Sequence, residues 1–294
     1  MGVEGLVANG KSLCEATAQS IQRCYNPAMS IRRIESLDDP LLAPYRNLKD
    51  KELARDGGRF IAEGENVVRR LLQSATPVES VLVAARKCEA IAPLVAEGVA
   101  MMAAEDELIE KIIGFEFHSG VLACGVRPAG RDLASVIPPP PTTALIVACQ
   151  QITNAANMGS LIRVCAAMGA DAMVLGERCC DPYFRQSVRV SMGTIFALPL
   201  VRSQNLLADL ERLAAIEKCE TWATVASGPA QPLNLLRRPT RVAVVFGNES
   251  AGLDERTIRS CQRRVTIPMR RGTDSLNVAI AAAVFLYQLS NGDD

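Results

Sequence analysis

The stretch from residue 242 to residue 289 constrains the fold of this chain more than any other. It begins with the apolar run VAVVF, which meets the polar sequence GNESAGL at Gly247. It continues with a short apolar strand, VTIPM, then a polar loop and a long helix rich in alanine. In open α/β sheets, ligands bind at the carboxyl ends of the strands. We therefore expect the functional site to lie where these two strands end.

The chain upstream of this stretch alternates strands and helices. The run ALIVACQ, which begins at Ala144, is continuously apolar, as in a strand covered on both faces. A polar loop, a helix and the apolar run AMVLG follow it, then a helix and strand within RQSVRVSMGTIFALPLV, the amphipathic helix LLADLERLAAIEK and the strand TWATVAS. This alternation predicts an α/β fold with a parallel sheet over residues 143–294.

Residues 31–128 predict a smaller, separate α/β domain. Its strands are expected at RFIAEG, VESVLVA, VAMMAA and GVLACGV, and its helices at ENVVRRLLQS, KCEAIAPLVAEG and EDELIEKIIG. The charged segment from residue 31 to about residue 55 is also expected to be helical, in pieces separated by Pro40 and Pro44.

Two further segments complete the predicted organisation. The prolines at positions 138–141 favour extended polyproline geometry, so residues 129–142 are expected to form a semi-rigid linker between the domains. Residues 1–30 are expected to be an N-terminal extension with little order, since the segment beginning at Met29 resembles a natural start.

Composition narrows the class of protein. The chain has no apolar stretch of about eighteen residues and no secretory signal, so we expect a cytoplasmic protein without membrane contact. Its ten cysteines include no C-x-x-C pair, and its one histidine, His118, is expected in a loop. We therefore expect reduced, mostly buried thiols, no metal site and no histidine-based catalysis.

Charge alone does not indicate a nucleic-acid partner, because the formal net charge is zero. Arginines nevertheless occur in adjacent pairs, and any one pair taken alone is best interpreted as solvated surface. The pairs are Arg32–Arg33, Arg69–Arg70, Arg237–Arg238, Arg263–Arg264 and Arg270–Arg271.

Three polar segments after predicted strands together resemble the three signature motifs of the SpoU/TrmH family of RNA ribose 2′-O-methyltransferases. The motifs are an asparagine followed by a glycine and a helical arginine, then G-N-E-x-x-G-L, and finally I-P-M with S-L-N. The matching residues are Asn157, Gly159, Arg163, Gly247, Asn248, Glu249, Gly252, Leu253, Ile267, Pro268, Met269, Ser275, Leu276 and Asn277. One departure is Ala155, which stands where the family usually has a proline that stiffens the loop.

The resemblance implies a reaction and an architecture. The reaction is S-adenosylmethionine-dependent methylation of a ribose 2′-hydroxyl in structured RNA. Ribosomal RNA is favoured over transfer RNA, because a separate RNA-binding domain is common among the ribosomal enzymes of the family. Residues 31–128 would be a ribosomal-protein-like RNA-binding domain, and residues 143–294 a methyltransferase domain with a trefoil knot, an exception to the rule that connections do not thread. The family also implies a homodimer and no metal.

The resemblance also implies the site residues. The catalytic set is Asn157, Arg163, Glu249, Ser275 and Asn277. The cofactor-binding set is Thr224, Phe246, Gly247, Asn248, Ile267, Met269, Ser275 and Leu276. Gly247 is expected to let the backbone approach the ligand closely, and main-chain groups near Ile267 and Met269 to bind an adenine edge. Ser275 and Asn277 could equally cap the last helix.

Two roles are open for Arg163. As a base it would have to lose a proton near pH 7, which costs about 7 kcal/mol or more from an ordinary arginine pKa. We therefore favour a second role, in which Arg163 binds an RNA phosphate and stabilises negative charge on the 2′-oxygen.

Two alternatives to this enzyme are considered. The first is a noncatalytic RNA-binding protein that keeps the knotted fold, although the intact motif residues argue against it. The second is a thiol-based redox or metal protein, which the number of cysteines suggests and which thiol titration would test.

Overall fold

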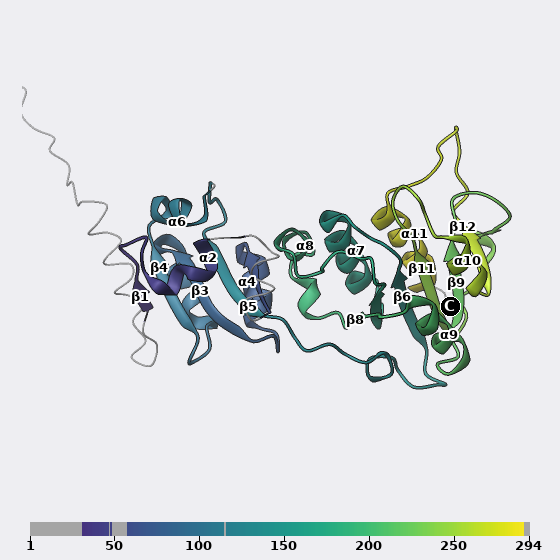
Figure 1. Cartoon of the computed structure of the whole chain (residues 1–294), viewed down its shortest axis with the longest axis horizontal. Helices are drawn as coiled ribbons and strands as arrows, with labels where there is room; N and C mark the ends of the chain where they lie inside the picture. The colour runs from purple at the N-terminus through teal and green to yellow at the C-terminus, as the bar shows by residue number, and fades with distance from the viewer. Residues whose placement is uncertain (1–30, 47, 49–57, 115, 291–294) are drawn as a thin grey trace, which may run out of the picture. The chain divides into compact units, whose positions relative to one another are not determined.

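The computed structural model describes residues 31–46, 48, 58–114 and 116–290 (Figure 1). These residues divide into two compact units, each with its own sheet. The first comprises the described residues up to Val126 except Ser74–Thr76, and the second begins at Arg127. The expected extension at residues 1–30 lies outside the described residues.

The first unit contains a mixed five-stranded sheet in the order β1-β4-β3-β5-β2. Strands β1, β4 and β3 are parallel, whereas β5 is antiparallel to its neighbours β3 and β2. The strands are β1 Ile31–Arg33, β2 Arg59–Glu63, β3 Val78–Ala84, β4 Ala100–Ala104 and β5 Val121–Val126. The α-helices of this unit are α2 Ala43–Arg46, α4 Glu65–Leu72, α5 Cys88–Ile91 and α6 Asp106–Ile113.

Two segments of this unit differ from the elements expected from the sequence. The segment that begins at residue 31 opens with the edge strand β1 rather than a helix, because Ile31–Arg33 pairs with β4. The sequence KCEAIAPLVAEG does not form one helix, since α5 ends at Ile91 and a 3-10 turn, η3 Ala92–Leu94, follows. Pro93 explains the break, because proline lacks the N–H that would continue α-helical bonding.

The second unit contains a seven-stranded sheet in the order β10-β12-β9-β11-β6-β7-β8, and every strand pair in it is parallel. The predicted α/β fold with a parallel sheet is therefore confirmed. The central strands β6 and β11 are buried along their whole lengths. The strands are β6 Ala144–Cys149, β7 Ala172–Leu175, β8 Leu200–Arg202, β9 Glu220–Thr224, β10 Gln231–Pro232, β11 Arg241–Phe246 and β12 Arg263–Thr266.

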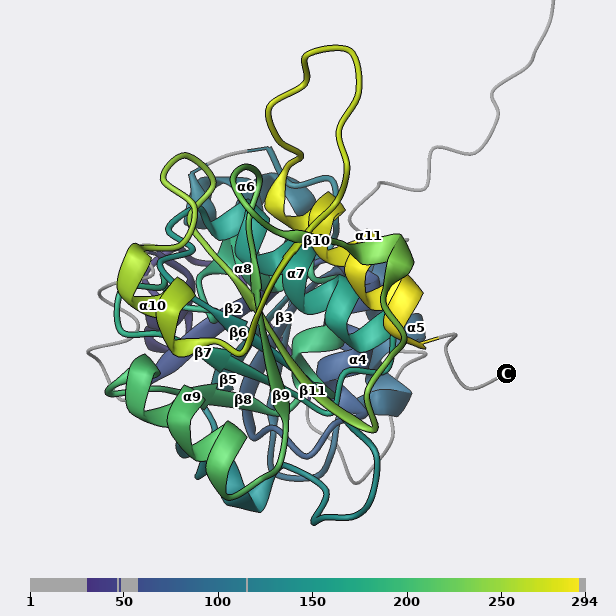
Figure 2. The same ribbon diagram turned by 90° about the vertical axis from the view of Figure 1, so that its right-hand side faces the viewer.

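Helices cover both faces of this sheet (Figure 2). Helices α9 and α10 pack together on one side, while α7 packs against α11 and α8 on the other. Alternate residues of each central strand face the two layers, as the pleat of a strand requires. The α-helices are α7 Ala155–Ala167, α8 Arg185–Val190, α9 Leu206–Ala215, α10 Glu255–Ser260 and α11 Val278–Ser290.

The segment expected to be a linker contributes to the core of the second unit. Leu133 and Ile137 are buried in the same apolar cluster as Leu210 of α9. The buried Arg241 guanidinium also donates a hydrogen bond to the backbone O of Thr142. Apolar side chains at Leu133 and Ile137 gain more from burial than an extended proline spacer would give them. The linker segment is thus anchored to the second unit by the side chains of Leu133 and Ile137.

Within the described parts of the chain, no helix is both long enough and apolar enough to cross a bilayer.

Candidate active site

The first motif lies at the carboxyl end of β6, where the chain enters α7. Asn154 caps this helix, because its Oδ1 accepts hydrogen bonds from the backbone N–H groups of Ala156 and Asn157 at 2.8 and 3.0 Å. Such a cap satisfies N–H groups that have no partner within the helix. Asn157 is consequently held in the first turn of α7, beside the end of the strand.

A cluster of amide and carboxylate side chains joins the three motifs. Asn157 Nδ2 donates to Glu249 Oε1 at 2.7 Å, and Asn277 Nδ2 donates to Asn157 Oδ1 at 3.0 Å. Asn248 Nδ2 lies 3.3 Å from Glu249 Oε2 and completes the cluster. Asn157 is separated from Glu249 by 92 positions in the chain and from Asn277 by 120. The fold thus brings together four of the residues predicted from the sequence.

The second motif forms a tight loop after β11. The backbones of Asn248 and Gly252 exchange hydrogen bonds of 3.0 and 2.9 Å, and Asn248 Nδ2 donates to the backbone O of Gln151 at 3.0 Å. A Cβ atom on Gly247 would lie 2.3–2.4 Å from backbone atoms of Gly252 and Leu253. The structure therefore gives a reason for glycine at position 247 in addition to the expected approach of a ligand.

Asn277 caps helix α11 and also connects this helix to Asn157. Its Oδ1 accepts a hydrogen bond of 2.9 Å from the backbone N–H of Ala279 in the first turn of α11. Its Nδ2 is left to reach Asn157. Ser275 is exposed, and its side chain makes no hydrogen bond to any other residue that the structure describes. The geometry joins Asn277, but not Ser275, to the cluster.

The predicted cofactor residues at the strand ends are already engaged. Thr224 Oγ1, at the end of β9, donates to the backbone O of Val245 at 2.8 Å. The Phe246 side chain is only 1% exposed and packs edge to face against Phe285 of α11, with ring centroids 5.6 Å apart. A ligand at this edge can contact the backbone near Phe246, while the ring stays in the core.

The other predicted cofactor residues lie on the segment between β12 and α11, residues 267–277. This segment projects from the body of the second unit (Figures 1 and 2). Ile267, Met269 and Leu276 are half-buried. Within the described residues, the backbone N–H groups of Ile267 and Met269 donate no hydrogen bond. These groups are therefore available to a ligand.

Arg163 lies on α7, six positions after Asn157, and the fold does not bring its side chain into the cluster. Its guanidinium is exposed and has no hydrogen-bond or ion-pair partner among the described residues. Gly159 of the same motif has a packing role, because a Cβ atom there would lie 2.5 Å from the backbone O of Ser187 in α8.

Gln150 holds the second-motif loop in place and was not predicted as a site residue. Its Nε2 donates to Asp254 Oδ2 at 2.8 Å and to Thr257 Oγ1 at 2.7 Å, and its Oε1 accepts from the Asp254 N–H at 3.0 Å. Hydrogen bonds, first of all from the Thr257 backbone, lower the pKa of Asp254. The Asp254 cap of α10 could have been found in the sequence, whereas its contact with Gln150 spans 104 positions.

None of the cysteines of the described residues forms a disulfide, and most of them are buried. Burial raises the pKa of Cys149, and it raises the pKa of Cys165 to about 12. Among the described residues there is no group of three or more His, Cys, Asp or Glu side chains that could hold a metal ion. His118 is exposed and lies 3.3 Å from Glu116.

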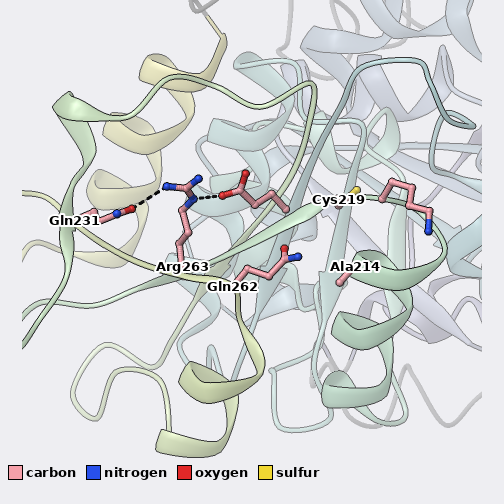
Figure 3. Close-up of a pocket in the computed structure, with 7 residues that line it drawn as sticks. Ala214, Cys219, Gln231, Gln262 and Arg263 are labelled. Carbon is pink, nitrogen blue, oxygen red and sulfur yellow. Dashed lines mark hydrogen bonds and ion pairs between the residues drawn. The ribbon is translucent and has the colours of Figure 1, made fainter.

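A cavity of about 560 Å³ lies elsewhere in the second unit, at the amino ends of its strands (Figure 3). It is lined by the first residues of β9, β10 and β12, which are Glu220, Gln231 and Arg263. Arg263 pairs with Glu220 and donates to Gln231 Oε1 at 3.1 Å. Its charged lining is thus satisfied internally, and it lies at the opposite edge of the sheet from the three motifs.

Comparisons with known proteins agree with the motifs. The SpoU rRNA Methylase family matches residues 144–287. An uncharacterized tRNA/rRNA methyltransferase of Mycobacterium tuberculosis is 33% identical over 264 residues, which cover 85% of this chain and 88% of that protein. The 23S rRNA (guanosine(2553)-2′-O)-methyltransferase RlmP of Bacillus subtilis is 27% identical over 260 residues, covering 88% and 99%.

A solved structure is similar over nearly the same extent. The AdoMet-bound rRNA methyltransferase from Sinorhizobium meliloti has a TM-score of 0.77 and 25% identity, covering 88% of this chain and 97% of that one. The parallel sheet and the joined motifs at its carboxyl edge are therefore those of an RNA methyltransferase. The chain belongs to the SpoU rRNA methylase family, which confirms the family expected from its motifs.

Proposed function

We propose that this protein methylates the 2′-hydroxyl of a ribose in structured RNA, with S-adenosylmethionine as methyl donor and ribosomal RNA as substrate. The observation that carries the proposal is the cluster of Asn157, Glu249 and Asn277, which joins one residue from each motif. Two relatives support it, since RlmP is named a 23S rRNA 2′-O-methyltransferase and the S. meliloti structure is described as AdoMet bound.

The residues at the carboxyl edge fit this cofactor. Ile267, Met269 and Leu276 supply half-buried apolar side chains, and the backbone N–H groups of Ile267 and Met269 have no partner among the described residues. Polar main-chain groups beside an apolar surface are what an adenine ring requires. We propose that these residues, with the backbone around Thr224 and Phe246–Asn248 and with Ser275, hold the cofactor. When bound, S-adenosylmethionine supplies the methyl group.

The protein must align the ribose hydroxyl with the methyl donor, and the hydroxyl proton passes to water as the new O–C bond forms. Both oxygens of the Glu249 carboxylate already accept hydrogen bonds, from Asn157 and Asn248. We therefore assign Glu249 to orienting Asn157, and we do not assign it as the base. Asn157 in turn fixes the position of Asn277 at the start of α11. The cluster thus shapes one wall of the site, against which the ribose is positioned.

Arg163 is the residue that we assign to the RNA. Its guanidinium is exposed, and within the described chain nothing pairs with it. An unpaired guanidinium can bind a phosphate through two parallel hydrogen bonds and stabilise charge that develops on the nearby 2′-oxygen. This arrangement favours the phosphate-binding role over the role of base.

The first unit, residues 31–128, is the part that we propose selects RNA, by shape rather than by sequence. Helix α4 and the turn after β3 bring Arg69, Arg86 and Lys87 to its surface, where Lys87 and Arg69 both pair with Glu65. A trefoil knot in the second unit is also part of the proposal. Strand β12 lies between β9 and β10, so the connection 225–230 passes over β12, an arrangement that is compatible with a threaded C-terminal chain.

We further propose that the protein is a homodimer that associates through α11. Ile280, Val284 and Tyr287 recur at helical spacing and are 55%, 40% and 63% exposed, although the opposite face of α11 is buried. A helix that is apolar on all sides needs a partner on its outer face. We expect Tyr287→Glu to convert a dimer into a monomer in sedimentation equilibrium. The control is Ile216→Glu at the end of α9, where an exposed apolar side chain is replaced, and it should leave the dimer unchanged. A monomeric wild-type protein would contradict this proposal.

The decisive experiment is transfer of labelled methyl from S-adenosylmethionine to total RNA from a strain that lacks this gene. We expect wild-type protein to label one ribose, which becomes resistant to alkaline cleavage. Arg163→Ala should lower transfer at least a hundredfold, since removing a donor to a developing negative charge costs about 10²–10³ in rate. Arg212→Ala serves as the matched control, because it removes an arginine of α9 that pairs with Asp132.

The outcome separates the two functions that remain. RNA binding without methyl transfer or cofactor binding would establish the noncatalytic RNA-binding protein. Transfer that is unaffected by Arg163→Ala would retain the enzyme and remove Arg163 from its mechanism. Cytoplasmic localisation stays a prediction from the sequence.

A further inference from the structure

Two arginines on the projecting segment 267–277 have no role in the function proposed so far. The side chains of Arg270 and Arg271 are exposed, and neither has a hydrogen-bond or ion-pair partner in the described chain. The nearby Asp274 carboxylate is also exposed and pairs with neither of them. Some other arginines of the second unit are held by acids, in the pairs Arg212–Asp132, Arg241–Glu217, Arg259–Glu255 and Arg263–Glu220. The two positive charges are thus left available to another molecule.

The backbone presents Arg271 at the tip of a tight turn. The Thr273 N–H donates to the Arg270 backbone O at 3.2 Å, and the two central residues, Arg271 and Gly272, have φ angles of 57° and 70°. Positive φ at both central positions defines a type I′ turn, which glycine, asparagine and aspartate favour. Arginine in this conformation costs about 1–2 kcal/mol. The turn therefore holds the Arg271 side chain at an exposed tip of the segment.

The position of the turn relates it to the site. Arg271 lies six positions before Asn277, so their Cα atoms are at most about 22 Å apart, given about 3.3–3.6 Å per extended residue. The same segment carries Met269 and Ser275, which we assign to the cofactor. An RNA strand lying on the site carries one phosphate at every nucleotide, and phosphates that flank the target ribose fall within this reach.

The charge of the arginines indicates which ligand they serve. S-adenosylmethionine has a sulfonium and an ammonium group against one carboxylate, so its net charge is positive and two guanidinium groups gain little from binding it. RNA offers a line of negative charges, to which arginine binds through paired hydrogen bonds. Such contacts are independent of base sequence and weaken as salt rises.

We propose that Arg270 and Arg271 bind backbone phosphates of the RNA next to the nucleotide that is methylated. This inference rests on the proposed function. It assigns the segment 267–277 two surfaces, one for the cofactor through Met269 and Ser275 and one for the substrate through the arginine turn. Cofactor and RNA would then bind to the same segment of chain.

The test compares two variants that each remove two positive charges. The first is Arg270→Gln with Arg271→Gln. The control is Lys218→Gln with Arg237→Gln, since both residues are exposed and precede strands at the amino edge of the sheet. Lys218 also has a positive φ, 54°, so the control matches the backbone conformation of Arg271. Glutamine keeps a long side chain in each case, and thermal denaturation verifies that both variants are folded.

Three quantities are measured on full-length protein: RNA affinity by filter binding at several salt concentrations, cofactor affinity by calorimetry, and the rate of methyl transfer. Each phosphate contact contributes about 0.7 to the slope of log affinity against log salt for single strands. We expect the arginine variant to lower this slope by about 1.4 and to weaken RNA binding about tenfold near 0.1 M salt. Its cofactor affinity should stay within twofold of wild type, and the control should match wild type throughout.

Two results would overturn the inference while leaving the proposed function intact. One is that the arginine variant of an active enzyme has the same RNA affinity and the same salt slope as the wild type. The other is a loss of cofactor affinity alone, which would assign the arginines to the cofactor. A wild-type protein that binds neither RNA nor S-adenosylmethionine would instead overturn the proposed function, and this inference with it.

Discussion

The candidate active site has two parts that the chain holds in different ways. Asn157, Glu249 and Asn277 are joined by side-chain hydrogen bonds of 2.7 and 3.0 Å, and Gly247 packs against the backbone of its own loop. The second part, residues 267–276, carries Met269 and Ser275 and projects from the body of the unit. Among the described residues its backbone N–H groups donate one backbone hydrogen bond, which closes the arginine turn. The first part, which we call the fixed part, is thus held in place without a ligand. The second part has polar groups that a ligand can still bind.

This difference separates the tasks of the two parts. Alignment of reacting groups requires side chains held to within a fraction of an ångström, which satisfied hydrogen bonds and close packing provide. Admission of a cofactor and an RNA strand requires a segment whose polar groups are not yet used. Substitutions in the first part should therefore change the rate of transfer, and substitutions in the second should change affinity. The predictions below test this division.

The largest effect on stability and on transfer rate is expected from Gly247→Ala, because Gly247 lies in the fixed part of the site. The added Cβ would lie 2.3 Å from the Gly252 carbonyl carbon, and backbone cannot move as a flexible side chain can. We expect unfolding free energy to fall by about 1–3 kcal/mol and methyl transfer to fall about a hundredfold as Glu249 is displaced. The measurements are urea denaturation and transfer rate.

Gly169→Ala is the control for this substitution. Gly169 has a positive φ, 73°, but a Cβ atom there meets nothing within 4 Å, and the residue lies beyond the other end of α7. It should cost about 1–2 kcal/mol of stability and leave the transfer rate per folded molecule unchanged. Wild-type activity in Gly247→Ala would show that the loop is not part of the rigid site.

A smaller effect is expected at Asn277, where a substitution can remove the hydrogen bond to Asn157 and keep the cap of α11. Serine keeps a cap for α11 but cannot reach Asn157, so Asn277→Ser should retain stability within about 0.5 kcal/mol while slowing transfer about tenfold. Asn277→Ala removes both contacts and should also lose about 1 kcal/mol of stability. Cofactor affinity, measured by calorimetry, should be similar in both. Full activity in the serine variant would remove the contact between Asn277 and Asn157 from the mechanism.

The smallest effect near neutral pH concerns the thiols beneath the fixed part. Burial raises the pKa of Cys165 to about 12 from an ordinary value of 9.0. Below pH 9 the thiol is protonated in both folded and unfolded states, so stability should not depend on it. Above pH 9 the unfolded thiol loses its proton while the folded one retains it, so unfolding free energy should fall by about 1.4 kcal/mol per pH unit toward pH 12.

Urea denaturation at pH 7, 9 and 10 checks this, with Cys165→Ala as a control that should show a shallower decline. Labelling of native thiols by an alkylating reagent at pH 7.5 should be slow for Cys149 and Cys165, because thiolate is the reactive form. Rapid labelling of these two would show that the fixed part opens, and it would revive the redox interpretation of the cysteines.

Local sequence patterns predicted most of the second unit and less of the first. The continuous apolar runs that became β6 and β11 were identifiable because both faces of those strands are covered. The three-residue strand β1 was missed, because its pairing with β4 brings together residues 70 positions apart. The linker prediction followed the prolines at 138–141, whereas Leu133 and Ile137 are placed in the core by their contact with α9.

The sequence by itself determined the parallel α/β unit, the family and the polar segments at the strand ends, because these depend on periodicity and on residue types at fixed spacing. Only the tertiary structure decided which of those residues meet. It joined Asn157 to Glu249 and Asn277, turned the Phe246 ring into the core, and left the side chains of Arg163, Arg270 and Arg271 without partners among the residues that the structure describes. Contacts between distant segments follow from strand order and helix packing, which no local pattern encodes.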